Sequence, residues 1–328
     1  MSQSRAEDSA RIGKRRLGKS ELRITKVGIG TAPIGSTPEW KVYWGPQDEK
    51  VAIKAIQTAI DIGVNWIDTA PFYGWERAEQ IVGKAIKGRR DEVHIFTKCG
   101  TIPDGKGGWV ENLKPESMRE QLEESLQRLG THRIDLYQFH DPDSRTTIEE
   151  PWRKMQHLID EEKVRYGGLS NHSTKLIARV LKVGTVVSSQ NQYNPLQRRA
   201  ESELFPFCLE REIAVLGWGS LLEGALADNF DVNELDPGDF RRRQVSAQRE
   251  NHDKIQQAFQ QVANNHGGTM VHAVIAWELM HPALTGAIIG VRSENEAREM
   301  IGGADWKLTP DDASLIEHAL AAWEGQPN

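Results

Sequence analysis

Eight short apolar runs, each ending in small or polar residues, constrain the fold more than any other feature of this sequence. The runs are Val27–Gly30, Trp66–Asp68, Val93–Lys98, Ile134–His140, Val164–Ser170, Val186–Gln190, Ile213–Trp218 and Ala287–Gly290. Helix-length segments lie between them, and in Pro115–Leu129 the apolar residues recur at helical spacing. Strands that alternate with helices pair in parallel through right-handed crossovers. Eight repeats in 328 residues therefore predict an α/β fold, a closed (β/α)8 TIM barrel, with an open doubly wound sheet as the alternative.

Segments outside the eight repeats predict additions to the barrel. Leu17–Ile24 surrounds a Gly-Lys-Ser turn and predicts a β-hairpin that plugs the N-terminal end of the barrel. The interval between Gly219 and Leu284 is too long for one crossover. It predicts an insertion with a loop and two extra helices, over Asn233–Arg243, Lys254–Asn264 and Met270–Met280. No linker divides the chain, so we expect a polar tail over residues 1–13 and a single domain over residues 14–328.

Composition excludes several classes of protein. The chain is 38% hydrophobic and 27% charged, which is typical of a globular protein with a core. It contains neither the run of about 18 apolar residues that a membrane span needs nor a signal peptide, so we expect a cytoplasmic location and no membrane partner. A net charge of −6 argues against nucleic-acid binding, and we expect the basic run Arg241–Arg243 to be a solvated loop. The two cysteines are too few for a disulfide framework and lack the spacing of a metal site, so we expect neither disulfides nor structural zinc.

Four polar side chains at or just beyond strand ends suggest an active site, because the C-terminal ends of barrel strands form the working rim of such folds. They are Asp68 and Tyr73 in WIDTAPFYG, Lys98 in IFTKCG and His140 in LYQFHDPD. A tyrosine is a poor acid at neutral pH unless a nearby cation stabilises its phenolate. Lys98 could supply that cation, Asp68 could orient the lysine, and His140 could bond the substrate oxygen. The set predicts an acid directed at a carbonyl group.

With these residues the sequence resembles the aldo-keto reductase superfamily, most closely its longer-chain bacterial and potassium-channel β-subunit-like branches. The family's Asp, Tyr, Lys and His tetrad matches Asp68, Tyr73, Lys98 and His140, and the similarity runs from about Arg16 to Glu317. The resemblance implies a barrel that binds NADPH without a Rossmann fold and transfers hydride to an aldehyde or ketone, or from an alcohol in the reverse direction.

The resemblance also implies a set of cofactor contacts. Gly30, Thr31 and Ala32 correspond to the segment beside the nicotinamide ribose, along with the tetrad residue Asp68. Side chains expected to hold the nicotinamide carboxamide, which needs both donors and acceptors, are Ser170, Asn171 and Gln190. Trp218 takes the place of an aromatic that stacks on the nicotinamide, and the pyrophosphate loop continues through Gly219, Ser220 and Leu221.

The adenosine end is predicted after the eighth strand, in Gly290, Val291, Arg292 and Ser293. Ser293 and Glu296 have the spacing of a helix-capping box. Arg292 stands where the family places a positively charged side chain that binds the adenosine 2′-phosphate. We therefore expect NADPH to be preferred, with NADH possible and with Arg298 as the competing phosphate ligand. Glu299 matches a residue that contacts adenine, but Met300 replaces a common asparagine and Glu296 takes a position that is basic in some branches.

Substrate contacts and alternative functions are less constrained. Four tryptophans near the strand ends could line a cleft for a small carbonyl or alcohol substrate, namely Trp40, Trp44, Trp75 and Trp109. Asp141 and Asp143 are interpreted as turn residues, and Cys99, next to Lys98, as a buried inert thiol on the opposite face of its strand. A nucleotide-sensing regulatory subunit is the alternative function, and a metal-dependent hydrolase is a third. The physiological substrate, the direction of reaction and the oligomeric state stay open.

Overall fold

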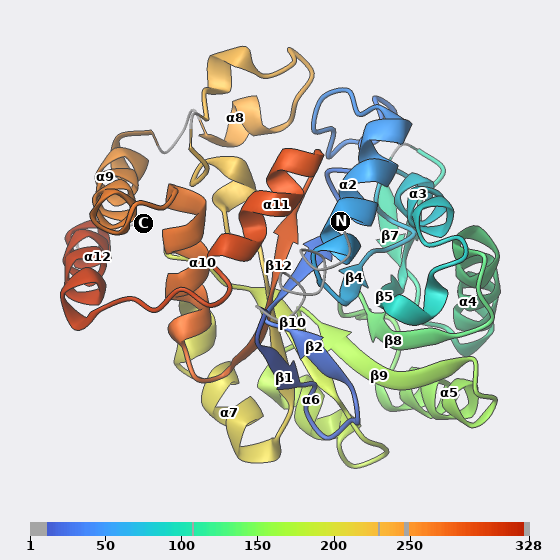
Figure 1. Ribbon diagram of the computed structural model, residues 1–328. Coiled ribbons are helices and arrows are strands. Elements are labelled where there is room, and N and C mark those ends of the chain that lie inside the picture. Colours follow the sequence, from blue (N-terminus) through green and yellow to red (C-terminus); the bar gives the residue numbers. More distant parts are fainter. Residues whose placement is uncertain (1–11, 107, 229, 246–248, 325–328) are drawn as a thin grey trace.

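The computed structural model describes residues 12–324, apart from residues 107, 229 and 246–248. Eight parallel strands form a closed barrel in which β12 pairs with β3 and closes the circle (Figure 1). The strands are β3 Val27–Gly30, β4 Trp66–Asp68, β5 His94–Cys99, β8 Ile134–Phe139, β9 Val164–Ser170, β10 Ser188–Gln192, β11 Ala214–Trp218 and β12 Leu284–Gly290. Each contains most of one predicted run, so the barrel is confirmed and the open sheet is wrong.

Helices follow the strands and cover the outside of the barrel. Those that complete the repeats are α2 Glu49–Asp61, α3 Arg77–Ala85, α4 Pro115–Leu129, α5 Glu149–Asp160, α6 Thr174–Val180, α7 Leu204–Arg211 and α11 Glu294–Gly302. Helix α4 shows why the pattern is readable. Pro115 occupies its first turn, Gly130 ends it in the left-handed conformation at φ 61°, and Met118, Leu122 and Leu129 are buried. Short 3-10 turns lie at Arg90–Glu92, Arg199–Glu201, Leu222–Gly224 and Val232–Glu234.

The predicted hairpin plugs the barrel. Strands β1 Lys14–Arg16 and β2 Arg23–Thr25 pair antiparallel, slightly outside the predicted Leu17–Ile24, because the turn between them carries the apolar side chains. Leu17, Leu22 and Ile24 are buried in one cluster with side chains from inside the barrel. That cluster includes Trp66, Phe96, Leu136, Val187, Leu216 and Ile288. The N-terminal end of the barrel is therefore filled with apolar side chains.

The remaining elements lie beyond β5, in the crossover between β11 and β12, and at the chain's end. Strands β6 Thr101–Pro103 and β7 Trp109–Glu111 form a second hairpin beyond β5, and α8 Arg241–Val245 lies in the insertion. Helices α9 Arg249–His266 and α10 Met270–Met280 match the two predicted helices, and α12 Pro310–Glu324 packs beside α9 (Figure 1). The basic run is not a solvated loop as a whole. Arg241 is buried at the start of α8, where its guanidinium is paired with Asp239.

The predicted N-terminal tail lies outside the described residues, except for its last two positions. Ile12 is buried, and the Gly13 N–H donates to Asp305. The boundary between the tail and the domain stays a prediction. Among the described helices, none is long and apolar enough to cross a membrane. The location in the cell stays a prediction.

Candidate active site

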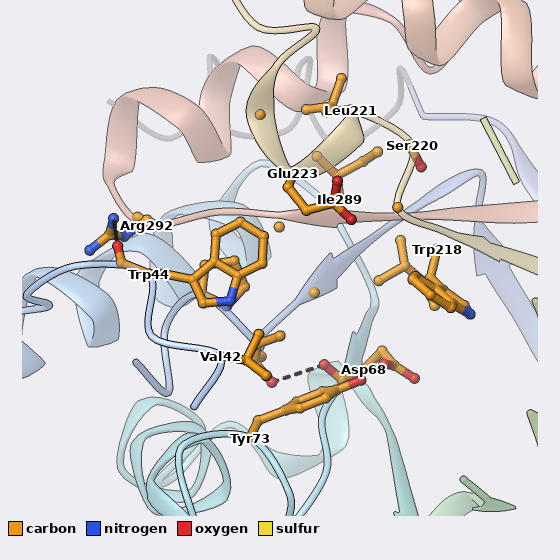
Figure 2. Close-up of a pocket in the computed structure, with 18 of the residues that line it drawn as sticks. Val42, Trp44, Asp68, Tyr73, Trp218, Ser220, Leu221, Glu223, Ile289 and Arg292 are labelled. Atoms are coloured by element: carbon orange, nitrogen blue, oxygen red, sulfur yellow. Dashed lines mark hydrogen bonds between the residues drawn. The ribbon is translucent and has the colours of Figure 1, made fainter. Parts of the chain in front are cut away.

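A cavity of about 930 Å³ opens at the C-terminal ends of the barrel strands. Figure 2 shows Asp68 and Tyr73 at one end of this cavity, with Trp218 on one side and Trp44 and Arg292 on the other. His140 also lines it, and Lys98 lies fully buried behind Asp68 and Tyr73. The structure therefore brings together the four residues predicted from the strand ends, of which the first and last, Asp68 and His140, are 72 positions apart in the chain.

Lys98 organises this group through three hydrogen bonds. Its Nζ atom donates to Asp68 Oδ1 at 2.5 Å, to the Tyr73 phenol oxygen at 3.0 Å and to the Thr69 carbonyl at 3.1 Å. Burial lowers the pKa of Lys98, but the charges of Asp68 and Tyr73 outweigh burial and leave the pKa raised. Lys98 is therefore a charged ammonium group that donates hydrogen bonds to three protein oxygens.

The direction of these bonds determines where the proton of Tyr73 points. An ammonium group can only donate, so the Tyr73 oxygen accepts from Lys98 and its own O–H points elsewhere. Burial raises the pKa of Tyr73, and the adjacent Lys98 charge opposes that rise. A protonated phenol that borders the cavity and is polarised by a cation is able to donate a proton to a carbonyl oxygen.

Asp68 is held on both of its oxygens. Oδ2 accepts from Gln190 Nε2 at 2.7 Å, on the side opposite Lys98. Gln190, predicted to hold the nicotinamide carboxamide, lines the cavity, but its amide N–H donates a hydrogen bond to Asp68. Gln190 therefore orients the carboxylate that orients the lysine.

His140 faces Tyr73 edge to face, with ring centroids 5.7 Å apart and an angle of 86° between the planes. Burial and the neighbouring Lys98 charge hold the pKa of His140 well below its ordinary value. The ring is therefore neutral at neutral pH, with one N–H donor and one acceptor. A neutral imidazole can donate a hydrogen bond to a ligand oxygen without placing a second positive charge beside Lys98.

The predicted nicotinamide contacts line the cavity beside the tetrad, and they are bonded to one another. The Trp218 indole N–H donates to Asn171 Oδ1 at 3.1 Å, and Asn171 Nδ2 donates to Asp141 Oδ1 at 2.9 Å. This chain fixes the plane of the Trp218 ring at the wall. The other lining residues in this region are Gly30, Thr31, Ala32, Ser170, Gly219, Ser220 and Leu221.

At the far end of the cavity, only some of the residues predicted to contact the cofactor line the wall. Gly290, Arg292 and Glu299 line the wall, whereas Val291 is fully buried and Ser293 lies outside the lining. Ser293 is instead the N-cap of α11, where its hydroxyl accepts from the Glu296 N–H, as the capping-box spacing predicted. Arg298 is exposed and also lies outside the lining.

Arg292 is not a free guanidinium. Its Nε donates to Gln47 Oε1 at 2.8 Å, and its two terminal nitrogens donate to the carbonyls of Trp44 and Pro46, each at 2.6 Å. Burial lowers the pKa of Arg292, and the nearby charge of Arg241 adds to that effect. Its role toward a phosphate stays a prediction; in the structure it ties residues 44–47 to the start of α11.

Two of the four predicted substrate tryptophans line the cavity. Trp40 and Trp44 belong to the wall, whereas Trp75 and Trp109 pack edge to face against Phe72, which is itself in the wall. Trp75 and Trp109 therefore contact the wall through Phe72 without lining the cavity, and Trp109 is 42% exposed. Their contact with substrate stays a prediction.

Several wall residues escaped sequence analysis. Asp141 was interpreted as a turn residue, but it borders the cavity, and burial raises the pKa of its carboxyl group. Its position directly after His140 was the one available signal. Other wall residues that the sequence did not single out as site residues include Val42, Phe72, Gln192, Glu223, Phe240 and Arg241. Cys99 is buried, with its pKa raised to about 12, and packs with Tyr137 as an inert thiol.

The wall fits an elongated polar cofactor better than a metal ion. No group of three or more metal-ligating side chains occurs within the described part of the chain. Among the described residues, the buried Ser220 hydroxyl has no partner in hydrogen-bond geometry, although it neighbours the Glu278 carboxyl group; because it borders the cavity, it can donate to a ligand oxygen. A volume of about 930 Å³ is at the upper end of the usual range for ligand pockets, and it suits a dinucleotide with a small substrate.

Comparison with known proteins decides the family. The sequence model of the Aldo/keto reductase family matches residues 26–321. The chain belongs to this family. As an aldo/keto reductase it is an oxidoreductase of a family that uses nicotinamide cofactors, as the resemblance implied.

Similar proteins support the assignment along the whole chain. The aldo-keto reductase YhdN of Bacillus subtilis (strain 168) is 33% identical over 307 residues, 91% of each chain. The NADH-specific methylglyoxal reductase of Escherichia coli (strain K12) is 32% identical over 324 residues, 94% of this chain and 98% of that protein. Among solved structures, the glycerol dehydrogenase AKR11B4 from Gluconobacter oxydans superposes on this aldo/keto reductase with a TM-score of 0.86 at 28% identity. The match covers 96% of this chain and 97% of that structure.

Proposed function

We propose that this protein catalyses reversible hydride transfer between NAD(P)H and an aldehyde or ketone, with Tyr73 as the general acid and base. The observation that carries the proposal is the 3.0 Å bond from Lys98 Nζ to the Tyr73 oxygen. This bond leaves the phenol proton directed away from the lysine. A bound nicotinamide cofactor supplies the hydride.

The side chains divide the remaining tasks. Tyr73 donates its proton to the carbonyl oxygen as negative charge develops there, and Lys98 stabilises the phenolate that is left. Asp68, itself held by Gln190, keeps Lys98 charged and in place. Neutral His140 orients the carbonyl oxygen toward Tyr73. In the direction of alcohol oxidation the same phenolate accepts the proton.

Residues along the wall would hold the cofactor. Trp218, fixed by Asn171, would stack on the nicotinamide, and the Ser220 hydroxyl would donate to a pyrophosphate oxygen. The alternative of a purely sensing subunit gains no support from the geometry, because the whole proton-transfer group is assembled.

The test is turnover by the wild type and by Tyr73→Phe. Substrates named for relatives, methylglyoxal and glycerol, head a panel of aldehydes, ketones and alcohols. Tyr73→Phe should lower kcat at least about 100-fold, the scale of general acid–base catalysis, with little change in the Kd of the reduced cofactor. Tyr166→Phe is the matched control, because Tyr166 bonds the hairpin residue Glu21 at the opposite end of the barrel. Near-normal turnover by Tyr73→Phe would contradict the proposal.

A further inference from the structure

We propose that this protein selects NADH over NADPH, because its own carboxylates and carbonyls already occupy the place where a 2′-phosphate would bind. The inference rests on the proposed function and concerns the far end of the same cavity. That end is formed by Arg292, Glu296, Glu299 and Met300.

The cations at this end are already engaged. Every nitrogen of the Arg292 guanidinium donates to residues 44–47, including a longer 3.5 Å bond to the Gly45 carbonyl. Arg241, the other cationic side chain among the described lining residues, is bidentate with Asp239 at 2.9 and 2.7 Å and also donates to the Glu223 carbonyl. A phosphate would have to displace these partners to gain either charge.

The start of α11 is also occupied, by Glu296. Its Oε2 accepts from the Arg292 N–H at 2.8 Å, and its Oε1 accepts from the Ser293 hydroxyl at 3.1 Å. A second carboxylate, Glu294, lies in the same first turn. The positive end of the helix dipole, which attracts a phosphate in other proteins, here faces the chain's own acids.

The charge balance of the wall points the same way. Glu223, Asp228, Glu296 and Glu299 line the part of the cavity beyond the tetrad, against Arg241 and Arg292. A 2′-phosphate brings close to two further negative charges beside Glu296, which repels them. A ribose 2′-hydroxyl carries no charge and can donate a hydrogen bond to the same carboxylate. Glu296 is thus a specificity-determining residue, and Arg292 is a positioning residue for residues 44–47.

Calorimetric titration tests the inference without turnover. Wild-type protein should bind NADH at least about tenfold more tightly than NADPH. The fragment pair AMP and adenosine 2′,5′-bisphosphate should show the same order. Glu296→Gln keeps the shape and removes the charge, so it should tighten NADPH binding at least about tenfold and change the Kd of NADH by less than about threefold.

Two further variants make the result specific. Glu294→Gln is the matched control, because Glu294 lies in the same turn but bonds Thr58 and is absent from the lining, so the ratio of the two Kd values should stay within about twofold of the wild type. Arg292→Ala should weaken both dinucleotides by a similar factor, as expected when a wall segment loses its anchor.

Tighter binding of NADPH than NADH by the wild type, an unchanged ratio in Glu296→Gln, or a selective loss of NADPH in Arg292→Ala would each overturn the inference and leave the proposed function standing. Failure of either dinucleotide to bind would overturn the proposed function itself, and this inference with it.

Discussion

One buried side chain has no part in the proposed chemistry and yet adjoins the site. Glu278 on α10 is fully buried, and neither of its carboxyl oxygens has a partner in hydrogen-bond geometry within the described part of the chain. It lies against the backbone of β11, where a Cβ atom on Gly217 would be 2.1 Å from Glu278 Oε1. Burial raises the pKa of Glu278 to about 8, and the neighbouring Ser220 hydroxyl opposes the rise. The group is therefore protonated at neutral pH.

This carboxyl group should make stability depend on pH in a sense opposite to that of most acids. Between its ordinary pKa of 4.5 and about 8, the folded chain keeps a proton that the unfolded chain releases, so the free energy of unfolding falls as pH rises across this window. Glu278→Gln removes that dependence. Its stability relative to the wild type should increase by about 2–3 kcal/mol between pH 6 and pH 8.5, measured by urea denaturation.

The control is Glu120→Gln, a charge removed from the exposed face of α4. It should change stability by less than about 0.5 kcal/mol at either pH. A difference between Glu278→Gln and the wild type that stays constant with pH would show that Glu278 is ionised in the folded protein.

Trp218 gives a prediction about binding. Its ring is held at the cavity wall by the bond to Asn171, so a nicotinamide stacked on it should quench its fluorescence. Trp218→Ala should abolish most of the quench and weaken cofactor binding by about 1–3 kcal/mol, as measured by fluorescence and calorimetry together. Trp306→Phe, which alters a ring packed on His266 and His272, should leave both unchanged. Quenching that survives in Trp218→Ala would assign it to another tryptophan.

Single side chains also show where sequence reasoning stops. The tetrad was readable because each member follows a recognisable strand, and strand order alone then brings the members together. The partners of Arg292 were not readable, since Gln47 lies 245 positions away on an irregular segment. A sequence identifies a guanidinium, but the packing of loops decides whether a ligand or a carbonyl receives its N–H groups.

Among the elements, the N-terminal hairpin is the one most easily separated from catalysis. Leu17 is fully buried among the side chains that fill the barrel interior. Leu17→Ala should cost about 2–5 kcal/mol of unfolding free energy, measured by denaturant titration, because it leaves a cavity in a packed cluster. The kcat of the folded variant should stay close to that of the wild type, because the tetrad lies at the other end of the barrel.

Lys19→Ala is the control for this hairpin variant. Lys19 is exposed in the same turn and pairs with Glu212 at 3.7 Å, a surface contact of little energetic value. A loss of kcat in Leu17→Ala without a loss of stability would mean that the hairpin acts on the site.

Elements were predictable to the extent that their residues are patterned. Barrel strands and α4 follow from apolar runs and helical spacing, and their ends shift by at most three residues. Helix α8 was missed because it has five residues and a basic sequence, so its position depends on Arg241 pairing with Asp239 rather than on periodicity. A helix of five residues is too short to show the apolar periodicity by which helices are recognised in a sequence.

At the scale of the whole molecule, two chain segments far apart in the sequence meet at the wall of the active-site cavity. The Phe240 N–H donates to the Tyr43 carbonyl at 2.9 Å, the Phe240 and Trp44 rings pack 4.9 Å apart, and the Arg241 guanidinium lies 5.0 Å above the Trp44 ring. We define this contact between residues 43–44 and 240–241 as the strap. Three of its members, Trp44, Phe240 and Arg241, line the cavity, so the strap forms part of the wall that a bound dinucleotide would contact.

The strap should therefore slow the release of cofactor. Phe240→Ala removes the ring contact but keeps the backbone bond, and it should speed dinucleotide dissociation at least about fivefold in stopped-flow displacement, the effect of losing roughly 1 kcal/mol of aromatic packing. Association should change far less. Glu120→Gln, on the exposed face of α4, should leave the dissociation rate within about twofold of the wild type. An unaltered rate in Phe240→Ala would mean that the strap does not limit release.

The plugged N-terminal end of the barrel also affects the order in which ligands bind and leave. Because the hairpin fills the N-terminal end of the barrel, we expect the dinucleotide and the carbonyl compound to enter the same cavity from its C-terminal side, with the nicotinamide reaching the tetrad before the substrate. Two ligands that enter by the same route are expected to bind one after the other. Steady-state kinetics should then be ordered, with the dinucleotide first in and last out. Oxidised dinucleotide should compete with reduced dinucleotide alone, and the alcohol product should be a noncompetitive inhibitor against both reactants.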